Sequence, residues 1–331
     1  MNSHLSAIAT ILHDGHYHDG VTLGKKLGIT RAAVCKFIKK LKDYGINIHS
    51  VKQKGYALLE PFVLLDRMAI QQQLKNNDLD IDIFESLPST NDYLKSLHGL
   101  VRPRICLAEQ QTQGKGRLNR YWHSPFGQNI YFSYSYFLEK DIGELAGLSL
   151  VVGLAIIHLL KQYQLPACIK WPNDVLYHGQ KLSGNLIEVE AKTHDSCRII
   201  IGIGINVNML EARMDEMLEW ASLRAITKQY VDRNKMCALL IKILLDYLKK
   251  FAAHGWSVFM NEWQSVDFLI NKIITLQCGQ QMFTGRMKGI NRLGNLLLEV
   301  DHGIIKGFSS GDTSIVKQTR SHPIDQQITL Q

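Results

Sequence analysis

A three-residue turn near the start of the chain separates two helical patterns and leaves them little freedom of relative placement. The turn is Gly28-Ile29-Thr30, and the first pattern, Val21–Leu27, precedes it. Gly28 suits the left-handed residue that ends a helix, and Thr30 suits the N-cap of the next one. After the turn, apolar residues recur with the spacing of one helical face, at Val34, Phe37, Ile38 and Leu41. With a further helical pattern over residues 5–13, this segment predicts a helix-turn-helix.

The helix after the turn is basic on the face opposite its apolar stripe, at Arg31, Lys36, Lys39 and Lys40. Two short extended runs follow, Ile46–Val51 and Tyr56–Leu59, joined by Lys52-Gln53-Lys54-Gly55. Residues 1–60 hold nine Lys and Arg against four acidic residues, which places +5 of the net charge of +8 there. Together these features favour a winged, DNA-binding domain over the alternative of a small helical domain with a solvated charged face. The DNA contacts are expected from Arg31, Lys36, Lys39, Lys52 and Lys54.

The pattern of the chain changes after Pro61, and its 331 residues are enough for two or three domains. A connecting helix is expected at about Leu65–Leu74. From Ile81 onward, apolar strands alternate with helices, which is typical of a mixed sheet packed on helices. The strands expected there are Ile105–Glu109, Asn129–Phe137, Ile169–Trp171, Val175–Tyr177, Leu182–Glu190 and Arg198–Val207, and the helices are Glu144–Tyr163 and a helix capped by Asp232 and ending near Ala252.

From about Lys272 the pattern becomes short strands with regularly placed turn glycines, which predicts a small β-barrel. The fold class is therefore α+β, with four parts. We expect a winged helix-turn-helix over residues 1–62, a central mixed α/β domain over 63–268, a small barrel over 269–318 and a loose tail over 319–331.

Composition and cysteine usage indicate a soluble protein of a reducing compartment. The six cysteines are scattered, with neither a C-x-x-C pair nor a metal-ligand spacing, and they fit buried thiols. The start of the chain lacks the basic and apolar regions of a signal peptide. The most apolar stretch, Leu148–Leu160, has 13 residues. A bilayer span needs roughly 20 residues, so we expect a buried core helix, a cytoplasmic location and no membrane contact.

One loop of the central domain combines glycines with cations: Gln111-Thr-Gln-Gly114-Lys115-Gly116-Arg117-Leu-Asn-Arg120-Tyr-Trp122. Gly114 and Gly116 let the backbone approach an anion closely, and Lys115, Arg117 and Arg120 add fixed positive charge. The spacing is neither that of a Walker A loop nor that of a dinucleotide fingerprint. Taken alone, such a loop is as often a solvated turn as an anion site.

Three further motifs follow along the chain. The first is Lys170-Trp171-Pro172-Asn173-Asp174, in which Trp-Pro suggests a rigid extended step, and Asn-Asp can cap, bind Mg²⁺ through oxygen atoms or orient an amine. The second is Lys181-Leu-Ser-Gly184-Asn185-Leu-Ile-Glu188, where Gly184 opens space beside a ligand or a second backbone. The third is Gly202-Ile-Gly204-Ile-Asn206-Val-Asn208, whose glycines allow a flat ligand to lie on the strand.

Together with Ser89-Thr90-Asn91, and in this order and spacing, these motifs resemble the motif series of biotin–protein ligases. The Arg31-Ala-Ala-Val segment after the glycine turn resembles the helix-turn-helix of the bifunctional type, the biotin operon repressor. The resemblance covers about residues 5–318. It implies a winged helix-turn-helix, a ligase domain like that of class II aminoacyl-tRNA synthetases and a C-terminal SH3-like barrel.

The resemblance also implies an activity, its substrates and its partners. Biotin and ATP would form biotinyl-5'-AMP, with Mg²⁺ near Asp174, and the biotinyl group would pass to a lysine of a biotin carboxyl-carrier protein. Biotinyl-AMP would favour a homodimer that binds operator DNA. The catalytic residues implied are Lys181, Arg117 and Asp174; the biotin site is Ser89, Thr90, Asn91, Gln111, Gly114, Lys115, Gly116, Arg117, Lys181 and Gly184; the nucleotide site is Arg120, Trp122, Lys170, Asn173 and Asn206.

Three positions depart from the family pattern. Lys115 stands where Arg is frequent, and Asn119 stands where Gly is common, although Asn tolerates a positive φ. Asn185 stands where an apolar strand residue is expected, which puts the detail of the pocket wall in question. Three alternatives stay open from the sequence: a biotin-sensing repressor without ligase activity, a lipoate or octanoate transferase of related fold, and a ligase whose N-terminal domain no longer regulates.

Overall fold

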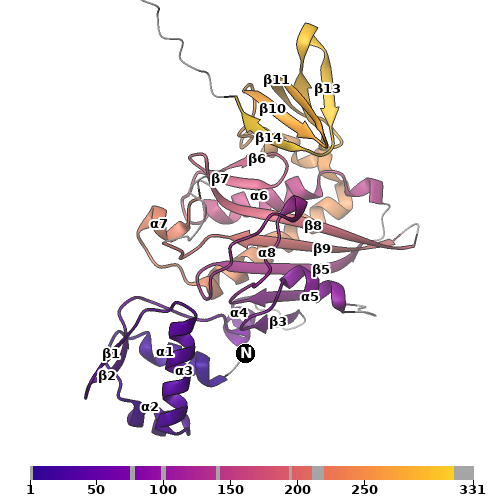
Figure 1. Cartoon of the computed structure of the whole chain (residues 1–331). Helices are drawn as coiled ribbons and strands as arrows, with labels where there is room; N and C mark the ends of the chain where they lie inside the picture. Colours follow the sequence, from indigo (N-terminus) through magenta and orange to yellow (C-terminus); the bar gives the residue numbers. More distant parts are fainter. Residues whose placement is uncertain are drawn as a thin grey trace, which may run out of the picture. The chain divides into compact units, whose positions relative to one another are not determined.

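The computed structural model describes residues 3–74, 79–97, 102–138, 142–193, 196–210 and 220–316 (Figure 1). The predicted tail, 319–331, lies outside these ranges. The chain divides into two compact units, Met1–Phe268 and Leu269–Gln331.

The first unit begins with the predicted winged helix-turn-helix. Its helices are α1 (Ser3–Leu12), α2 (Gly20–Leu27) and α3 (Arg31–Asp43), and its wing pairs β1 (Ile48–Val51) with β2 (Gly55–Leu58). Gly28 has φ +67° and ends α2, while the Thr30 hydroxyl accepts a hydrogen bond from the Ala33 amide and begins α3. Both predicted caps are therefore confirmed. The apolar face of α3 buries Val34, Ile38 and Leu41 against α1 and the wing.

Phe126 of the central domain completes the core of the winged helix-turn-helix. Phe126 is buried in that core, and the Tyr44 ring stacks on it with centroids 3.9 Å apart. The Tyr44 hydroxyl donates to Glu85 at 2.7 Å, and Lys40 forms an ion pair with the same carboxylate. Lys40 is thus directed to the central domain, which corrects its predicted place on the free basic face.

The segment that leaves the wing is held by a buried ion pair. Arg233 and Glu109 have no exposed side-chain surface and lie 2.7 Å apart. Arg233 also donates to the Val63 carbonyl at 2.7 Å, and Asn234 donates to the Leu64 carbonyl at 3.0 Å. The predicted connecting helix follows as α4 (Arg67–Leu74). Because a buried charge is tolerated only when it is paired, this contact fixes the chain where it enters the central domain.

The central domain is built on a seven-stranded sheet in the order β3-β4-β5-β9-β8-β7-β6 (Figure 1). Only β3 and β4 are parallel, so the sheet is mixed as predicted. The six predicted strands are confirmed to within a few residues, and β3 is an addition. The strands are β3 (Asp80–Phe84), β4 (Arg104–Ala108), β5 (Ile130–Leu138), β6 (Cys168–Lys170), β7 (Asp174–Tyr177), β8 (Gln180–Thr193) and β9 (Ser196–Ile205).

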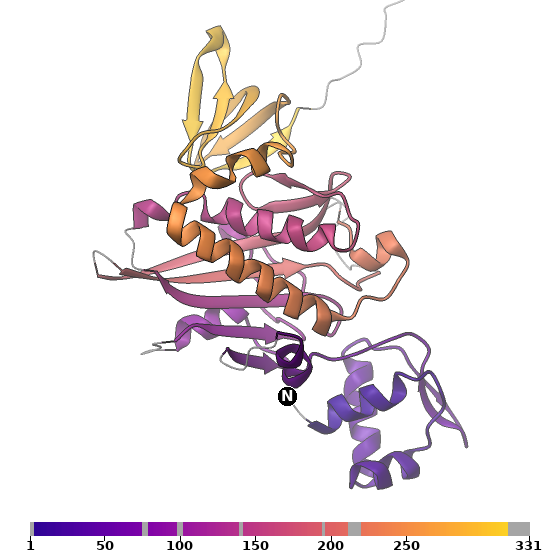
Figure 2. The same cartoon turned by 180° about the vertical axis from the view of Figure 1, so that it is seen from behind.

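Helices α6 (Leu148–Lys161) and α8 (Arg233–His254) cross one face of this sheet, as Figure 2 shows from behind. The segment Gly143–Lys161 is long and apolar enough to cross a membrane, yet most of it is buried inside the protein. It is the core helix that the sequence predicted. The short helix α5 (Thr90–Ser96) packs Leu94 on Cys106 of β4 and Ile200 of β9. Its position brings the predicted Ser89-Thr90-Asn91 motif onto the sheet.

The remaining helical elements of the first unit are short. They are η1 (Arg117–Asn119), η2 (Ile142–Leu145), α7 (Leu223–Thr227), η3 (Trp256–Phe259) and α9 (Met260–Gln264). The predicted cap of α8 is confirmed, since the Asp232 carboxylate accepts from the amides of Asn234 and Lys235. The expectation of buried thiols holds for Cys106, Cys197 and Cys237, whereas Cys35 is exposed on α3.

The second unit is an antiparallel sheet in the order β13-β12-β11-β10-β14, with the short turn η4 (Asp301–Gly303) before β13. Its strands are β10 (Ile273–Cys278), β11 (Gln281–Ile290), β12 (Leu296–Glu299), β13 (Ile305–Phe308) and β14 (Asp312–Ile315). The fully buried side chains of Ile274, Leu276, Met287, Leu296 and Leu298 form its core.

Candidate active site and nucleic-acid interface

A buried polar network surrounds the N-terminus of α5. The Ser89 hydroxyl caps the helix by accepting from the Asp92 amide. The Thr90 amide donates to Gln111 Oε1 at 2.8 Å, and the Thr90 hydroxyl lies 3.0 Å from the same oxygen. Gln111 Nε2 in turn donates to the Ser124 hydroxyl at 3.2 Å. The structure thus brings Ser89, Thr90 and Gln111 together, as the resemblance implied.

Two glycines of β9 make room for other side chains of the site. A Cβ atom at Gly202 would lie 2.5 Å from Asn91 Oδ1, and one at Gly204 would lie 2.4 Å from Trp122 Cε2. These separations are far shorter than van der Waals contact. The strand was expected to receive a flat ligand at both glycines. Instead, Gly202 receives the Asn91 amide and Gly204 receives the Trp122 indole.

The predicted anion loop is closed on itself by backbone hydrogen bonds. The Gly116 amide donates to the Arg120 carbonyl at 2.7 Å, and the Trp122 amide donates to the Gly114 carbonyl at 2.9 Å. Asn119 has φ +57°, which agrees with the predicted tolerance for positive φ. Leu118, at φ +55°, shares this conformation.

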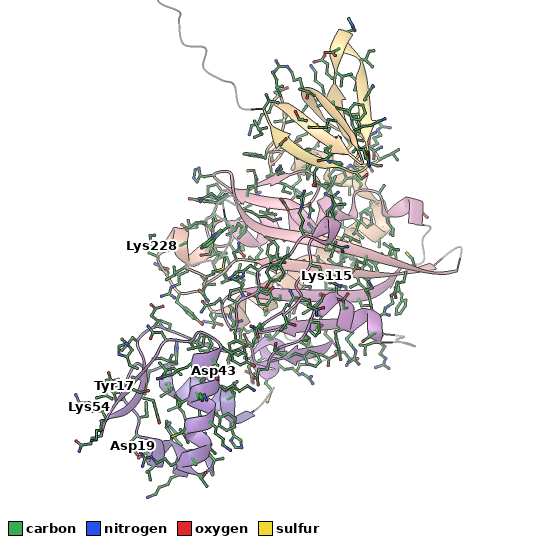
Figure 3. All side chains as sticks on the ribbon, viewed as in Figure 1. Tyr17, Asp19, Asp43, Lys54, Lys115 and Lys228 are labelled. Carbon is green, nitrogen blue, oxygen red and sulfur yellow. The ribbon has the colours of Figure 1, made fainter. Side chains whose placement is uncertain are left out.

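The cations of this loop point in different directions. Lys115, which Figure 3 labels over the central domain, pairs with Asp92 of α5 at 2.6 Å. Arg117 donates to Asn173 Oδ1 at 3.4 Å and so reaches the Trp-Pro-Asn-Asp turn. Arg120 lies exposed at the end of the loop. Lys115 thus connects the loop to α5, and Arg117 connects it to Asn173, another predicted site residue.

The part of the site built by β7, β8 and Trp122 has the Lys181 ammonium at its centre. Lys181 Nζ is 2.7 Å from Asp174 Oδ1 and 5.3 Å from the centre of the Trp122 ring. The β-bulge between β7 and β8 shifts the register here and pairs Asp174 with Gly184. A Cβ atom at Gly184 would lie 3.2 Å from Lys181 Cε, so the glycine accommodates the lysine stem. Lys170 ends β6 opposite Asp174.

The turn before Asp174 is held by Asn185, the residue that departs from the family pattern. Asn173 Nδ2 donates to the Asn185 carbonyl at 2.8 Å, and the Ser149 hydroxyl donates to Asn185 Oδ1 at 2.8 Å. The Trp171-Pro172 peptide is cis, not the extended step that was expected. Asn185 is thus a well-paired buried amide that builds this wall of the site.

Asn206 holds the backbone of the same region with its side-chain amide. Its side chain donates to the Ala221 carbonyl at 3.1 Å and to the Lys181 carbonyl at 3.3 Å. The backbone of Lys181 is therefore held by the residue that follows β9. Sequence reasoning gave no role to four polar residues that contact the site, because single serines and a strand glutamate give no local signal: Ser124, Ser133, Ser149 and Glu188.

The surface of the winged helix-turn-helix carries the predicted DNA contacts. All five side chains are exposed, on α3 and on the turn of the wing: Arg31, Lys36, Lys39, Lys52 and Lys54. Figure 3 labels Lys54 at the end of the wing. The Cys35 thiol of α3 lies 3.2 Å from the Tyr56 hydroxyl of β2, which ties the helix to the wing. A rigid basic helix beside a basic wing is the geometry that enters a DNA groove.

The fold and the two sites define a class of protein. Cations and a glycine-rich loop beside a buried polar network suit an enzyme that joins two anionic reactants, and a winged helix-turn-helix on the same chain suits a DNA-binding regulator.

Comparison with known proteins agrees with this class. Residues 83–206 match the model of the biotin/lipoate A/B protein ligase family, and residues 4–57 match that of an HTH domain. The chain is 37% identical over 313 residues to the bifunctional ligase/repressor BirA of Salmonella typhimurium, covering 93% of this chain and 96% of the relative. It is 30% identical over 298 residues to the bifunctional ligase/repressor BirA of Bacillus subtilis, covering 88% and 92%.

A solved structure shows the same similarity. The biotin protein ligase from Aquifex aeolicus in complex with biotin and ATP gives a TM-score of 0.63 at 30% identity, covering 72% of this chain and 99% of that one. The chain belongs to the family of bifunctional biotin ligase/repressor proteins.

Proposed function

We propose that this chain is an ATP-dependent biotin–protein ligase that also represses transcription when it carries biotinyl-5'-AMP. The observation that carries the ligase half is the Lys181 ammonium, held by Asp174 beside the Trp122 ring, with Gly184 making room for the lysine stem and Gly204 for the indole. A cation beside a buried polar network and an aromatic ring is where two anionic groups can meet.

The first step joins biotin to AMP. A carboxylate oxygen of biotin attacks the α-phosphorus of ATP, the bond to the leaving diphosphate breaks, and biotinyl-5'-AMP forms. Negative charge builds up between the reactants, and Lys181 supplies a point charge to it while Arg117 offers a planar fork to phosphate oxygens. Asp174 orients the ammonium, and Trp122 covers the adenine.

The second step transfers the biotinyl group to a lysine of a biotin carboxyl-carrier protein. The lysine amine attacks the acyl carbon, an amide bond forms, and AMP leaves. The mixed anhydride would be hydrolysed by water if it were exposed. The loop from Gly114 to Trp122, closed by its own backbone hydrogen bonds, excludes water until the acceptor arrives.

Magnesium does not fit a site made by the protein alone. Asp174 contributes one carboxylate, which is paired with Lys181, and the described part of the chain holds no group of three His, Cys, Asp or Glu suited to a metal. Mg²⁺ is usually held by one or two carboxylates together with phosphate oxygens. We therefore assign no step to a resident metal.

The regulatory half of the proposal concerns α3 and the wing. Their five exposed cations would contact operator DNA upstream of biotin-synthesis genes, and a homodimer would present two copies to a palindrome. Domain limits at 62 and 268, an SH3-like barrel in the second unit and a cytoplasmic location complete the proposal.

The test is incubation of the full chain with ATP, labelled biotin and a biotin-carrier domain. Label should appear on the carrier lysine, and lipoate should not replace biotin. A chain that binds biotin and operator DNA but forms no adenylate would be a sensor without ligase activity, which contradicts the proposal.

A further inference from the structure

We infer that Asp92 is a positioning residue of the reaction, because its carboxylate holds the glycine loop closed through Lys115. Breaking this ion pair is then one step in the release of the adenylate. The inference rests on the proposed function, since the enclosed ligand is taken to be biotinyl-5'-AMP. Asp92 lies in the first turn of α5, directly after the Ser89-Thr90-Asn91 motif and outside the predicted site.

The loop from Gly114 to Trp122 is a narrow hairpin whose two arms pair through the backbone. The Gly116 amide donates to the Arg120 carbonyl, and the Trp122 amide donates to the Gly114 carbonyl. These bonds join the arms to each other, so the hairpin can move as one piece. Its position over the site therefore depends on side chains that reach from it to other elements.

Lys115 reaches from the first arm of the hairpin to α5. Its ammonium lies 2.6 Å from Asp92 Oδ2, with 43% of the lysine and 34% of the aspartate side chain exposed. The Ser89 hydroxyl accepts from the Asp92 amide, so the helix cap fixes the backbone that carries the carboxylate. Arg117 reaches the other way and donates to Asn173. Of these two contacts, the one to Asp92 joins opposite charges.

The tip of the closed hairpin has an unfavourable backbone conformation. Leu118 and Asn119 both lie in the left-handed region, with φ +55° and +57°. Leucine in this region costs free energy, because its Cβ approaches the following carbonyl oxygen. The contacts that hold the hairpin offset this cost. Closure is therefore a balance, and the loss of the ion pair between Lys115 and Asp92 shifts it toward the open loop.

A second interpretation of the same ion pair predicts the opposite result. If Lys115 bound the anionic adenylate directly, Asp92 would compete with the ligand for the ammonium, and removing the Asp92 charge would slow release. If the carboxylate instead holds the loop, removing its charge speeds release. The direction of the change in Asp92→Asn therefore distinguishes the two interpretations.

The experiment measures the release of labelled biotinyl-AMP from the full chain during a chase with excess unlabelled biotinyl-AMP. Asp92→Asn and Lys115→Met should each speed release about threefold to fivefold at low salt, the upper range for one exposed ion pair. The double variant should be no faster than either single variant, because both remove the same contact. Lys115→Arg keeps a cation that reaches the carboxylate and should release at the unaltered rate.

Salt gives a readout that a purely structural role of Asp92 would not change, because added salt screens an exposed ion pair. The difference in release rate between the unaltered protein and Asp92→Asn should disappear as salt rises from about 0.05 M to about 0.5 M. Glu299→Gln is the matched control. It removes the charge of a similarly exposed pair in the second unit, Lys288 and Glu299 at 2.9 Å, and should leave release unchanged.

The outcomes separate this inference from the proposed function. A protein that does not bind biotinyl-AMP removes the proposed function, and this inference with it. A protein that binds the adenylate, but releases it at the unaltered rate or more slowly in Asp92→Asn, removes this inference alone. So do additive effects in the double variant, or a difference that persists at high salt. Asp92→Ser, which also lacks the charge, decides the matter if Asp92→Asn does not fold.

Discussion

The Lys181 ammonium and the Asp174 carboxylate, from neighbouring strands, form an ion pair with Nζ and Oδ1 2.7 Å apart. The bulge between β7 and β8 sets Asp174 opposite Gly184, and the lysine stem lies over that glycine. Both side chains keep partial solvent access, at 34% and 25% exposure. The ammonium is thus oriented by one carboxylate yet accessible to a further anion.

Lys181→Ala should lower the rate of biotinyl-AMP formation by at least about 10²–10³-fold, because one electrostatic donor to the developing charge is lost. The measurement is diphosphate release with biotin and ATP, together with circular dichroism to establish folding. Lys228→Ala, at an exposed lysine labelled in Figure 3, is the control and should retain full activity. Normal adenylate formation by Lys181→Ala would remove the lysine from the active site.

Arg117→Gly should leave the fold intact but release the adenylate early. The substitution removes the side chain that joins the loop to Asn173 at 3.4 Å, and with it an anion contact. Free biotinyl-AMP then acylates lysines of bystander proteins, which labelled biotin on added albumin would reveal. Arg292→Gly, at an exposed turn of the second unit, should not label albumin. Labelling of the carrier alone, at the normal rate, by Arg117→Gly would show that the arginine does not retain the adenylate.

The two glycines of β9 should affect different substrates. Gly202→Ala pushes on Asn91 and should raise the KM for biotin, whereas Gly204→Ala pushes on Trp122 and should raise the KM for ATP. Each effect should be about tenfold, the size of one disturbed buried contact. The two variants are each other's control, since they differ only by position on one strand. Equal effects of both on one KM would contradict the assignment of the two halves of the pocket.

The helix-turn-helix and most of the sheet could be predicted because their signals are local. Gly28 and Thr30 cap helices through contacts within one helical turn, and each strand is marked by its own short apolar run. The site motifs were likewise readable as short segments, and their resemblance to one family supplied the roles that are predicted for most of these residues.

The features that could not be predicted from the sequence depend on contacts between residues that are far apart in the chain. Glu188 reaches Asn91 across 97 positions, and Phe126 completes the core of a domain that ends more than sixty residues earlier. Lys40 has the same sequence pattern as its basic neighbours, yet its ion pair with Glu85 directs it to the central domain instead of the predicted DNA face. Gly204 looked like a ligand floor, yet the Trp122 indole occupies that space. None of these pairings has a periodicity or a fixed spacing.

Deleting residues 1–62 should abolish DNA binding and leave the ligase core folded but less stable. The deletion exposes Phe126 and removes the Tyr44 ring stacked on it. Exposing a buried Phe should lower the free energy of unfolding by about 1.5–3 kcal/mol. Thermal unfolding and biotinyl-AMP formation check this, with the truncated Phe126→Ser protein as a more soluble control. Sequence-specific DNA binding by the truncated chain would contradict the assignment of the DNA interface.

Biotinyl-AMP should favour a homodimer that binds operator DNA more tightly than the monomer does. Each chain has one exposed basic helix, α3, and a two-fold axis would present two of them to a palindrome with half-sites about one helical turn or a multiple apart. A ligand shifts an equilibrium only by its differential affinity, so the adenylate must bind the dimer more tightly than the monomer. Sedimentation with and without biotinyl-AMP, followed by operator shift at fixed salt, measures both steps. Because Arg31, Lys36, Lys39, Lys52 and Lys54 are exposed cations, the affinity should fall steeply with added salt, and Lys54→Ala should reduce the salt slope by about one unit. An unchanged monomer whose DNA affinity ignores the ligand would leave a ligase with a non-regulatory winged helix.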